Sequence, residues 1–275
     1  MSLKSQLGNT SLQSLLLPAL VVLLIASSFA IGVLWTKVSY LEKGAPAATT
    51  ATPAAGAGQA AAPEAATVDI NKIKELFDKD LIKFGDKNRK VLFVEIADPS
   101  CPYCHVAGGK NPELAKQVGT RFQYASDGGS YLPPVPEMKK LVDSGKASYI
   151  YIYSNGHGNG EMGTKALYCA QEQGKYWQAH DLLYTNAGYE LLNNTIKNDK
   201  AQAGALSDFL KGAADSGKLK SCLESGKYDD RISTDQALAS SLGISGTPGF
   251  FVNSTIYRGA YGFTDMKTVV DAVLK

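Results

Sequence analysis

The sequence predicts an α/β fold in which helices cover a sheet and an all-helical subdomain is inserted, preceded by one transmembrane helix and a disordered linker. First, the apolar run Val91–Ile96 is followed closely by Cys101-Pro102-Tyr103-Cys104. Second, no strand pattern interrupts residues 161–241. Third, residues 249–275 return to short apolar strands and a closing helix. A continuous apolar run is typical of a strand buried on both faces, as in a sheet covered by helices.

The N-terminal residues predict a membrane anchor over 15–36, after a short cytoplasmic segment, 1–14. Leu15–Trp35 carries no charged side chain, and a helix of this length spans the ~30 Å hydrocarbon layer. Trp35 and Tyr40 stand where interfacial aromatic residues are common. A cleavable signal peptide, with small residues around Ser28-Phe29-Ala30, is the alternative, although the apolar run continues beyond that point.

Residues 37–67 predict a flexible tether, because the Ala/Pro/Thr/Gly composition offers too little apolar surface to offset the entropy of ordering. The folded domain is therefore expected over 68–275. The formal charge of the chain is +2 with both signs interspersed, which gives no indication of nucleic-acid binding.

Hydrophobic spacing and turn residues predict the elements of this domain. The first part should hold a helix over Val68–Phe84 capped by Asp69, a helix from the Cys-Pro-Tyr-Cys motif broken at Gly108-Gly109, a helix from Asn111 and a strand at Arg121–Ala125. An extended proline-rich surface segment at Tyr131–Pro136, a helix over Glu137–Val142 and a strand at Ala147–Tyr153 should follow. The rest should be a helical stretch over Glu161–Leu183, helices at 202–213, 215–224 and 228–241, a hairpin at 249–259, and a final helix capped by Thr264.

The Cys101–Cys104 pair at a strand-to-helix junction predicts a dithiol that cycles with a disulfide. A cysteine at a helix start faces unsatisfied N–H groups and the positive end of the helix dipole, which stabilise its thiolate. Pro102 suits the first helical turn, where no N–H is needed. Half of a zinc site is the alternative, but Cys169 and Cys222 do not provide a second pair at short spacing.

Glu95 interrupts the apolar strand six residues before Cys101. A buried carboxylate costs several kcal/mol unless it is neutral, paired or hydrated. We therefore expect Glu95 beneath the dithiol as a proton acceptor, unless it lies at an exposed end of the strand. The loop Ser154–Gly160 is rich in glycine but lacks the spacing of a phosphate-binding loop.

Together these features resemble the DsbA-like branch of the thioredoxin superfamily. The resemblance covers 88–106, 161–184 and 243–275, and includes Gly246-Thr247-Pro248 before the strand Phe250–Val252. It implies a thioredoxin-like fold, an exposed nucleophile at Cys101, a buried resolving thiol at Cys104, an acidic residue at Glu95, and a cis peptide before Pro248 next to the dithiol.

The resemblance also implies partners and no cofactor beyond the Cys101–Cys104 disulfide. Reduced or unfolded client proteins would bind at Thr247, Pro102, Tyr103 and His105, and a membrane protein of the DsbB or vitamin K epoxide reductase type would reoxidise the dithiol. Tyr103 stands where strongly oxidising members often carry His, which leaves the direction of electron flow open. No metal site is expected.

Cys169 and Cys222 both fall in the helical block. In an oxidising compartment this even pair most simply forms a structural disulfide, and two free buried thiols are the alternative.

The expected function is an extracytoplasmic, single-pass thiol–disulfide oxidoreductase that oxidises client cysteines; secretion after signal cleavage is the alternative location. A reductase or isomerase could use the same dithiol. A different class of function, a copper chaperone or other metal-binding module, would use the two thiols as ligands.

Overall fold

The computed structural model describes residues 67–275, and the predicted anchor and tether lie outside these residues. Within 67–275, no helix combines the length and the apolar character needed to cross a membrane. The described residues belong to one compact unit.

The centre of the fold is a five-stranded sheet in the order β1-β3-β2-β4-β5. Its strands are β1 (Ile82–Phe84), β2 (Val91–Ala97), β3 (Ala147–Tyr153), β4 (Gly249–Val252) and β5 (Thr255–Arg258). β2 and β3 are parallel, and every other neighbouring pair is antiparallel. The strands at 147–153 and 249–259 and the buried strand before the motif are confirmed.

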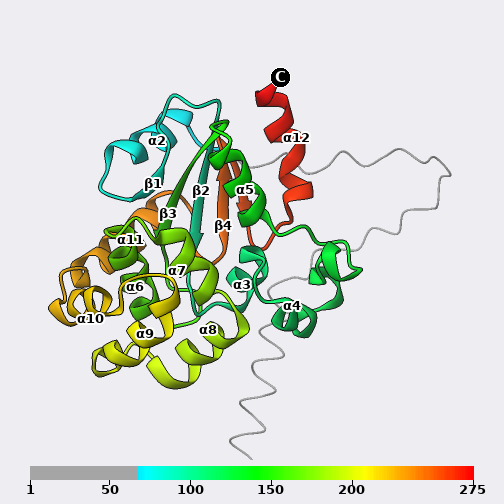
Figure 1. Ribbon diagram of the computed structural model, residues 1–275. Coiled ribbons are helices and arrows are strands. Elements are labelled where there is room, and N and C mark those ends of the chain that lie inside the picture. The colour runs from blue at the N-terminus through cyan, green and yellow to red at the C-terminus, as the bar shows by residue number, and fades with distance from the viewer. Residues whose placement is uncertain (1–66) are drawn as a thin grey trace, which may run out of the picture. The chain divides into compact units, whose positions relative to one another are not determined.

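Helices cover both faces of the sheet (Figure 1), as the apolar strands require. They are α2 (Ile70–Glu75), α3 (Pro102–Gly108), α4 (Pro112–Val118), α5 (Pro134–Asp143), α6 (Glu161–Gln171), α7 (Tyr176–Leu183), α8 (Asn186–Glu190), α9 (Ala203–Phe209), α10 (Ser216–Ser225), α11 (Asp229–Ser241) and α12 (Phe263–Leu274). Alternate residues of β2 enter two separate cores: Leu92, Val94 and Ile96 pack with α2 and α11, whereas Phe93 and Ala97 join the core that holds both motif cysteines.

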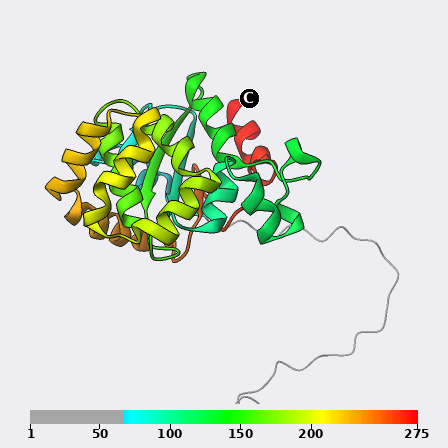
Figure 2. The same cartoon turned by 60° about the horizontal axis from the view of Figure 1, so that its bottom comes forward.

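The helical block between β3 and β4 is confirmed, because α6 to α11 follow one another without a strand. Figures 1 and 2 show α6–α10 gathered as one group beside the sheet. The predicted stretch over 161–183 is divided into α6 and α7 by Gly174, which has a φ of 67°, in the left-handed region that favours glycine.

Four local predictions are wrong. The helix expected over 68–84 ends in a 3₁₀ turn at Leu76–Asp78, and Ile82–Phe84 pairs with β3 instead. Apolar residues at Ile82 and Phe84 fit one face of a short edge strand as well as they fit a helical turn. Arg121–Ala125 contains parts of two 3₁₀ turns rather than a strand.

The extended segment expected over Tyr131–Pro136 ends at Pro133. Pro134 and Pro136 lie in the first turn of α5, where a missing N–H costs no hydrogen bond within the helix. α12 is capped by Gly262, whose N–H donates to Asp265, rather than by Thr264.

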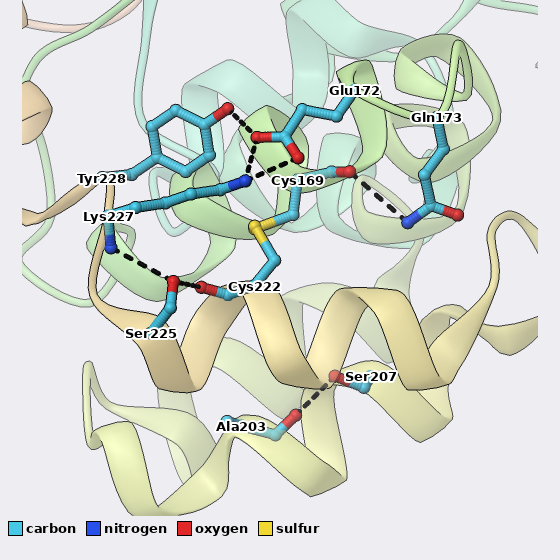
Figure 3. Close-up of a disulfide and its surroundings, with 9 residues drawn as sticks. All are labelled: Cys169, Glu172, Gln173, Ala203, Ser207, Cys222, Ser225, Lys227 and Tyr228. Atoms are coloured by element: carbon cyan, nitrogen blue, oxygen red, sulfur yellow. Dashed lines mark hydrogen bonds and ion pairs between the residues drawn. A yellow bond between two sulfur atoms is a disulfide. The ribbon is translucent and has the colours of Figure 1, made fainter.

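Cys169 and Cys222 form a disulfide between α6 and α10, as expected. Their Cα atoms lie 6.0 Å apart, although 53 residues separate them in the sequence. Figure 3 shows the bridge beside the ion pair of Glu172 with Lys227. The disulfide therefore ties two helices of the inserted block that are distant along the chain.

Replacing both Cys169 and Cys222 with Ser should lower the free energy of unfolding by about 2 to 4 kcal/mol, because the unfolded chain regains the entropy of a long closed loop. Urea unfolding of the oxidised proteins measures this loss. The matched control is reduction by dithiothreitol, which opens Cys101–Cys104 in both proteins and Cys169–Cys222 in the parent alone, so the urea midpoints of the reduced parent and the reduced variant should coincide. Equal midpoints for the variant and the oxidised parent would contradict a stabilising role.

Candidate active site

The dithiol motif lies at the junction of β2 and α3, as the sequence predicts. Cys101 is the N-cap residue of α3, with φ −79° and ψ 126°, and Pro102 occupies the first turn. The amide groups of Cys104 and His105 donate to the Cys101 carbonyl oxygen at 3.1 and 3.2 Å. The helix start is thus built on Cys101 itself, and its sulfur lies among the N–H groups that have no partner within the helix.

The loop Thr247-Pro248 faces the motif from the neighbouring strand. Because β4 runs antiparallel to β2, Gly249 pairs with Ile96 near the end of β2. The Thr247–Pro248 peptide is cis, as the resemblance implied. The Cys101 thiol lies 3.5 Å from the Thr247 carbonyl oxygen and donates to it. Cys101 therefore stands between the start of a helix and a backbone carbonyl.

The pKa values of the two cysteines are shifted in opposite directions. A hydrogen bond from Cys104 is the main cause that lowers the pKa of the Cys101 thiol to about 7. Burial opposes this effect, and the Thr247 side chain and the amides of Cys104 and Tyr103 assist it. Burial, together with the hydrogen bond and charge of Cys101, raises the pKa of Cys104 well above its usual value. At neutral pH the thiolate is therefore carried by Cys101.

Cys101 is less accessible than expected. Only 4% of the residue is exposed, and Cys104 is fully buried. The prediction of an exposed nucleophile is therefore wrong, because the Thr247 loop and α3 cover most of the Cys101 side chain. Tyr103, in contrast, is 42% exposed. A partner must therefore reach Cys101 along the surface that Tyr103 and Thr247 border.

Alkylation of the reduced protein with iodoacetamide should follow a pH profile with a midpoint near 7, because only the thiolate reacts and the pKa of Cys101 is lowered from 9.0 to about 7. The rate should rise as pH increases through this value and level off above it. Mass spectrometry identifies the modified cysteine and should find Cys101 before Cys104. A midpoint near 9 would contradict the stabilisation of the thiolate.

Glu95 is fully buried, which excludes the alternative of an exposed strand end. It lies on the same face of β2 as Phe93 and Ala97, the face whose core includes Cys101 and Cys104. The Tyr149 hydroxyl donates to Glu95 Oε2, whereas Oε1 has no hydrogen-bond partner among the described residues. Burial raises the pKa of the Glu95 carboxyl, against the opposing effects of His180 and Tyr149. Glu95 is thus a buried carboxyl in the core that holds the dithiol, with one of its oxygens bonded to Tyr149.

His105 does not face a client surface, so this predicted role is wrong. The side chain is fully buried, and its Nε2 lies 2.8 Å from the Pro99 carbonyl oxygen. The ring also stacks on Tyr184 at 4.9 Å between centroids. Burial lowers the pKa of His105 to about 4, and the imidazole is neutral at pH 7. The helical block covers this side of α3, which the sequence of α3 alone does not reveal.

Asp98 is a site residue that the sequence reasoning missed. Its buried carboxylate accepts four hydrogen bonds: Oδ1 from the amide and hydroxyl of Ser100, both at 2.7 Å, and Oδ2 from the amides of Gly156 and His157, both at 2.8 Å. The Asp98 carbonyl also accepts from the Cys101 amide at 2.9 Å. Asp98 therefore fastens the glycine-rich loop 154–160 to the start of the motif.

The glycines of that loop permit the close approach. A Cβ added to Gly156 would lie 1.7 Å from Thr247 Oγ1, and one added to Gly160 would lie 1.7 Å from Asp98 Oδ1. The loop is thus packed between the motif and the Thr247 loop. The sequence does contain a hint of this contact, since an Asp stands shortly before the Cys-x-x-Cys motif and a glycine-rich loop occurs later in the chain. It does not show that the two meet.

The described residues contain no group of three or more His, Cys, Asp or Glu side chains arranged to hold a metal ion. The chemistry that this geometry supports is thiol–disulfide exchange by the two cysteines themselves.

Comparisons with known proteins agree with this fold. Residues 136–272 match a family model described as Thioredoxin. Similar sequences include the sodium/proton antiporter NhaA 3 of Salinispora tropica, 26% identical over 196 residues that make up 70% of this chain and 24% of that protein. Another is a putative protein-disulfide oxidoreductase of Rickettsia felis, 24% identical over 75% of this chain and 66% of that protein. The chain spans about a quarter of the length of the antiporters it matches.

Solved structures with a similar fold include BdbD of Bacillus subtilis, with 18% identity, a TM-score of 0.53 and coverage of 76% of this chain and 97% of that chain. Alpha-DsbA1 of Wolbachia pipientis has 19% identity, a TM-score of 0.52 and coverage of 71% and 91%. DsbG of Mycobacterium tuberculosis has 18% identity, a TM-score of 0.51 and coverage of 74% and 97%. Residues 67–275 therefore form a thioredoxin-like α/β domain in which α6–α11 lie between β3 and β4.

Proposed function

We propose that this protein is an extracytoplasmic thiol–disulfide oxidoreductase that oxidises cysteines of reduced client proteins through the Cys101–Cys104 pair. The observation that carries the proposal is the asymmetry of the dithiol: Cys101 caps α3 beside the Thr247 carbonyl and has a pKa lowered to about 7, whereas burial raises the pKa of Cys104. An attacking or leaving thiolate requires the first property, and a protected resolving thiol requires the second.

The reaction begins with the Cys101–Cys104 disulfide. A client thiolate attacks Cys101 Sγ, a new bond joins the two sulfurs, and the Cys101–Cys104 bond breaks. The electron pair leaves on Cys104, which takes up a proton because its pKa is high. A second client thiolate then attacks the client sulfur of the mixed disulfide and expels Cys101, which is a good leaving group because its pKa is low. The client gains a disulfide, and the protein becomes the dithiol.

We propose that Glu95 accepts the proton of Cys104 and returns it, because Glu95 lies on the face of β2 whose core holds both motif cysteines. Replacement with Gln keeps an acceptor for Tyr149 but cannot exchange a proton. The rate of mixed-disulfide resolution by Cys104 should then fall and lose part of its pH dependence. Unchanged rates between pH 6 and 8 would remove Glu95 from the mechanism.

The same proposal includes an N-terminal membrane anchor and a membrane protein of the DsbB or vitamin K epoxide reductase type as reoxidant. The apolar run at 15–35 and the Ala/Pro/Thr/Gly-rich segment after it support this arrangement. Alkaline extraction of membranes tests the anchor: the full chain should stay in the pellet, and a chain that starts at residue 67 should be released.

The equilibrium redox potential of Cys101–Cys104, measured against glutathione, tests the direction of electron flow. Strong oxidases have potentials near about −120 mV and reductases near about −270 mV. A lowered pKa of Cys101 stabilises the dithiol form and raises the potential, so the proposed oxidation of clients requires a value above the reductase figure. A value at or below the reductase figure would replace client oxidation with client reduction as the function of the same dithiol.

A further inference from the structure

A cleft of about 490 Å³ opens beside the dithiol motif. Its lining includes Tyr103 from the motif and Thr247 from the cis-proline loop. Tyr103 and Tyr261, 42% and 46% exposed, are the two exposed large apolar side chains of residues 67–275, and both line this cleft. The remaining lining residues are Arg121, Phe122, Arg258, Gly259, Ala260 and Asp265.

One wall of the cleft is built by the segment between α3 and α5. Figures 1 and 2 show α4 and the segment after it on the side of α3 that faces away from the helical block α6–α10. This segment has a small core of its own, in which the buried Phe122 ring meets Tyr131 edge-on at 5.6 Å. Tyr131 is held by two backbone hydrogen bonds, with Gln123 and with Ala125. The wall is therefore an ordered part of the fold.

Phe122 connects this wall to the motif. The Tyr103 and Phe122 rings lie 5.6 Å apart, and the Arg121 guanidinium lies 4.4 Å from the centre of the Phe122 ring. Arg121 is itself exposed. The segment thus places an aromatic ring and a cation next to the residue between the two cysteines.

The charges of the cleft are unbalanced. Arg121 and Arg258 are both exposed, and neither forms an ion pair within residues 67–275. Arg258 donates from Nε to the Gly243 carbonyl at 3.2 Å. The carboxylate of the lining, Asp265, accepts from the Gly262 amide at 2.9 Å at the start of α12. Two guanidinium groups and one exposed carboxylate therefore line the cleft, which leaves one positive charge in excess.

We propose that this cleft selects client segments that carry acidic side chains next to the reacting cysteine, with Arg121 and Arg258 as the residues that determine this specificity. The inference rests on the proposed exchange at Cys101 and names its substrate class. An acidic segment entering along Tyr103 and Thr247 approaches both guanidinium groups, whereas a basic segment meets like charges.

The test uses three dithiol peptides that are identical except for two Asp, two Asn or two Lys residues beside the first cysteine. The rate of reduction of the Cys101–Cys104 disulfide is measured by acid quenching and alkylation. Each rate is divided by the rate of the same peptide with an uncharged disulfide, 2-hydroxyethyl disulfide, which corrects for the effect of the charges on the peptide thiol. The corrected rate should be about tenfold higher for the Asp peptide than for the Lys peptide, and the ratio should shrink in 0.5 M salt.

Arg121→Glu and Arg258→Glu should each lower this ratio by about threefold or more, and the double variant should remove or invert it. Lys90→Glu is the matched control, because Lys90 is exposed, changes the charge equally and precedes β2, at the end of the strand opposite the motif. Equal corrected rates for all peptides, or an equal change in the control, would overturn the selectivity. Absence of exchange with every peptide would instead overturn the proposed function.

Discussion

Replacing Cys101 with Ser should reduce thiol–disulfide exchange by at least about a thousandfold, because the hydroxyl provides neither a thiolate nor a sulfur that can form a disulfide. The residue is the N-cap of α3, a position where Ser is common, so the fold should be retained. Oxidation of a reduced dithiol peptide and reduction of insulin are the two measurements. Activity equal to that of the parent in both assays would end the proposal of an oxidoreductase.

Cys104 variants separate attack from resolution. Cys104→Ser keeps the nucleophile, so stable mixed disulfides between Cys101 and client peptides should accumulate. Cys104→Ala should also raise the pKa of Cys101, because the hydrogen bond from Cys104 is the main cause of its lowered value. Ser can still donate such a bond, and the alkylation midpoint should therefore be lower in Cys104→Ser than in Cys104→Ala. The Cys169/Cys222 double variant is the control, since it alters sulfur content but not the dithiol.

The parts of the site that lie on contiguous sequence could be predicted. Cys101, Pro102 and Cys104 occupy one strand-to-helix junction, whose chemistry follows from helix geometry. Thr247-Pro248 came from the resemblance, and the antiparallel pairing of β4 with β2 explains why it lies at the same edge of the sheet.

The parts that depend on packing between distant segments could not be predicted. His105 is buried because Tyr184 of the helical block stacks on it, a contact between residues 79 positions apart. Phe122 lies against Tyr103 only because the segment after α4 folds back on α3. Neither contact leaves a periodic pattern in the sequence. The role of Asp98 was hidden for the same reason, since two of its donors lie 58 and 59 residues away.

Asp98→Ala should lower the free energy of unfolding by about 5 kcal/mol, an exceptional loss for one residue. The carboxylate is fully buried and accepts four hydrogen bonds, from Ser100, Gly156 and His157. Without it, the amide and the hydroxyl of the buried Ser100 lose their acceptor, each at a cost of about 1 to 3 kcal/mol, and the exposed residues Gly156 and His157 lose the bonds that hold their loop. Urea unfolding of the oxidised proteins gives the difference.

Two further variants identify the source of this loss. Asp98→Asn keeps one oxygen acceptor and turns an amide donor toward the other pair of donors, so its stability should lie between those of Asp98→Ala and the parent. Asp86→Ala removes an exposed carboxylate that, within residues 67–275, accepts only from the Asn88 amide, at 2.7 Å, and should cost less than about 1 kcal/mol. If Asp98→Ala were no more destabilising than Asp86→Ala, the carboxylate would not be what holds the loop 154–160 to the motif, and the close packing of Gly156 against Thr247 would have to maintain the loop alone.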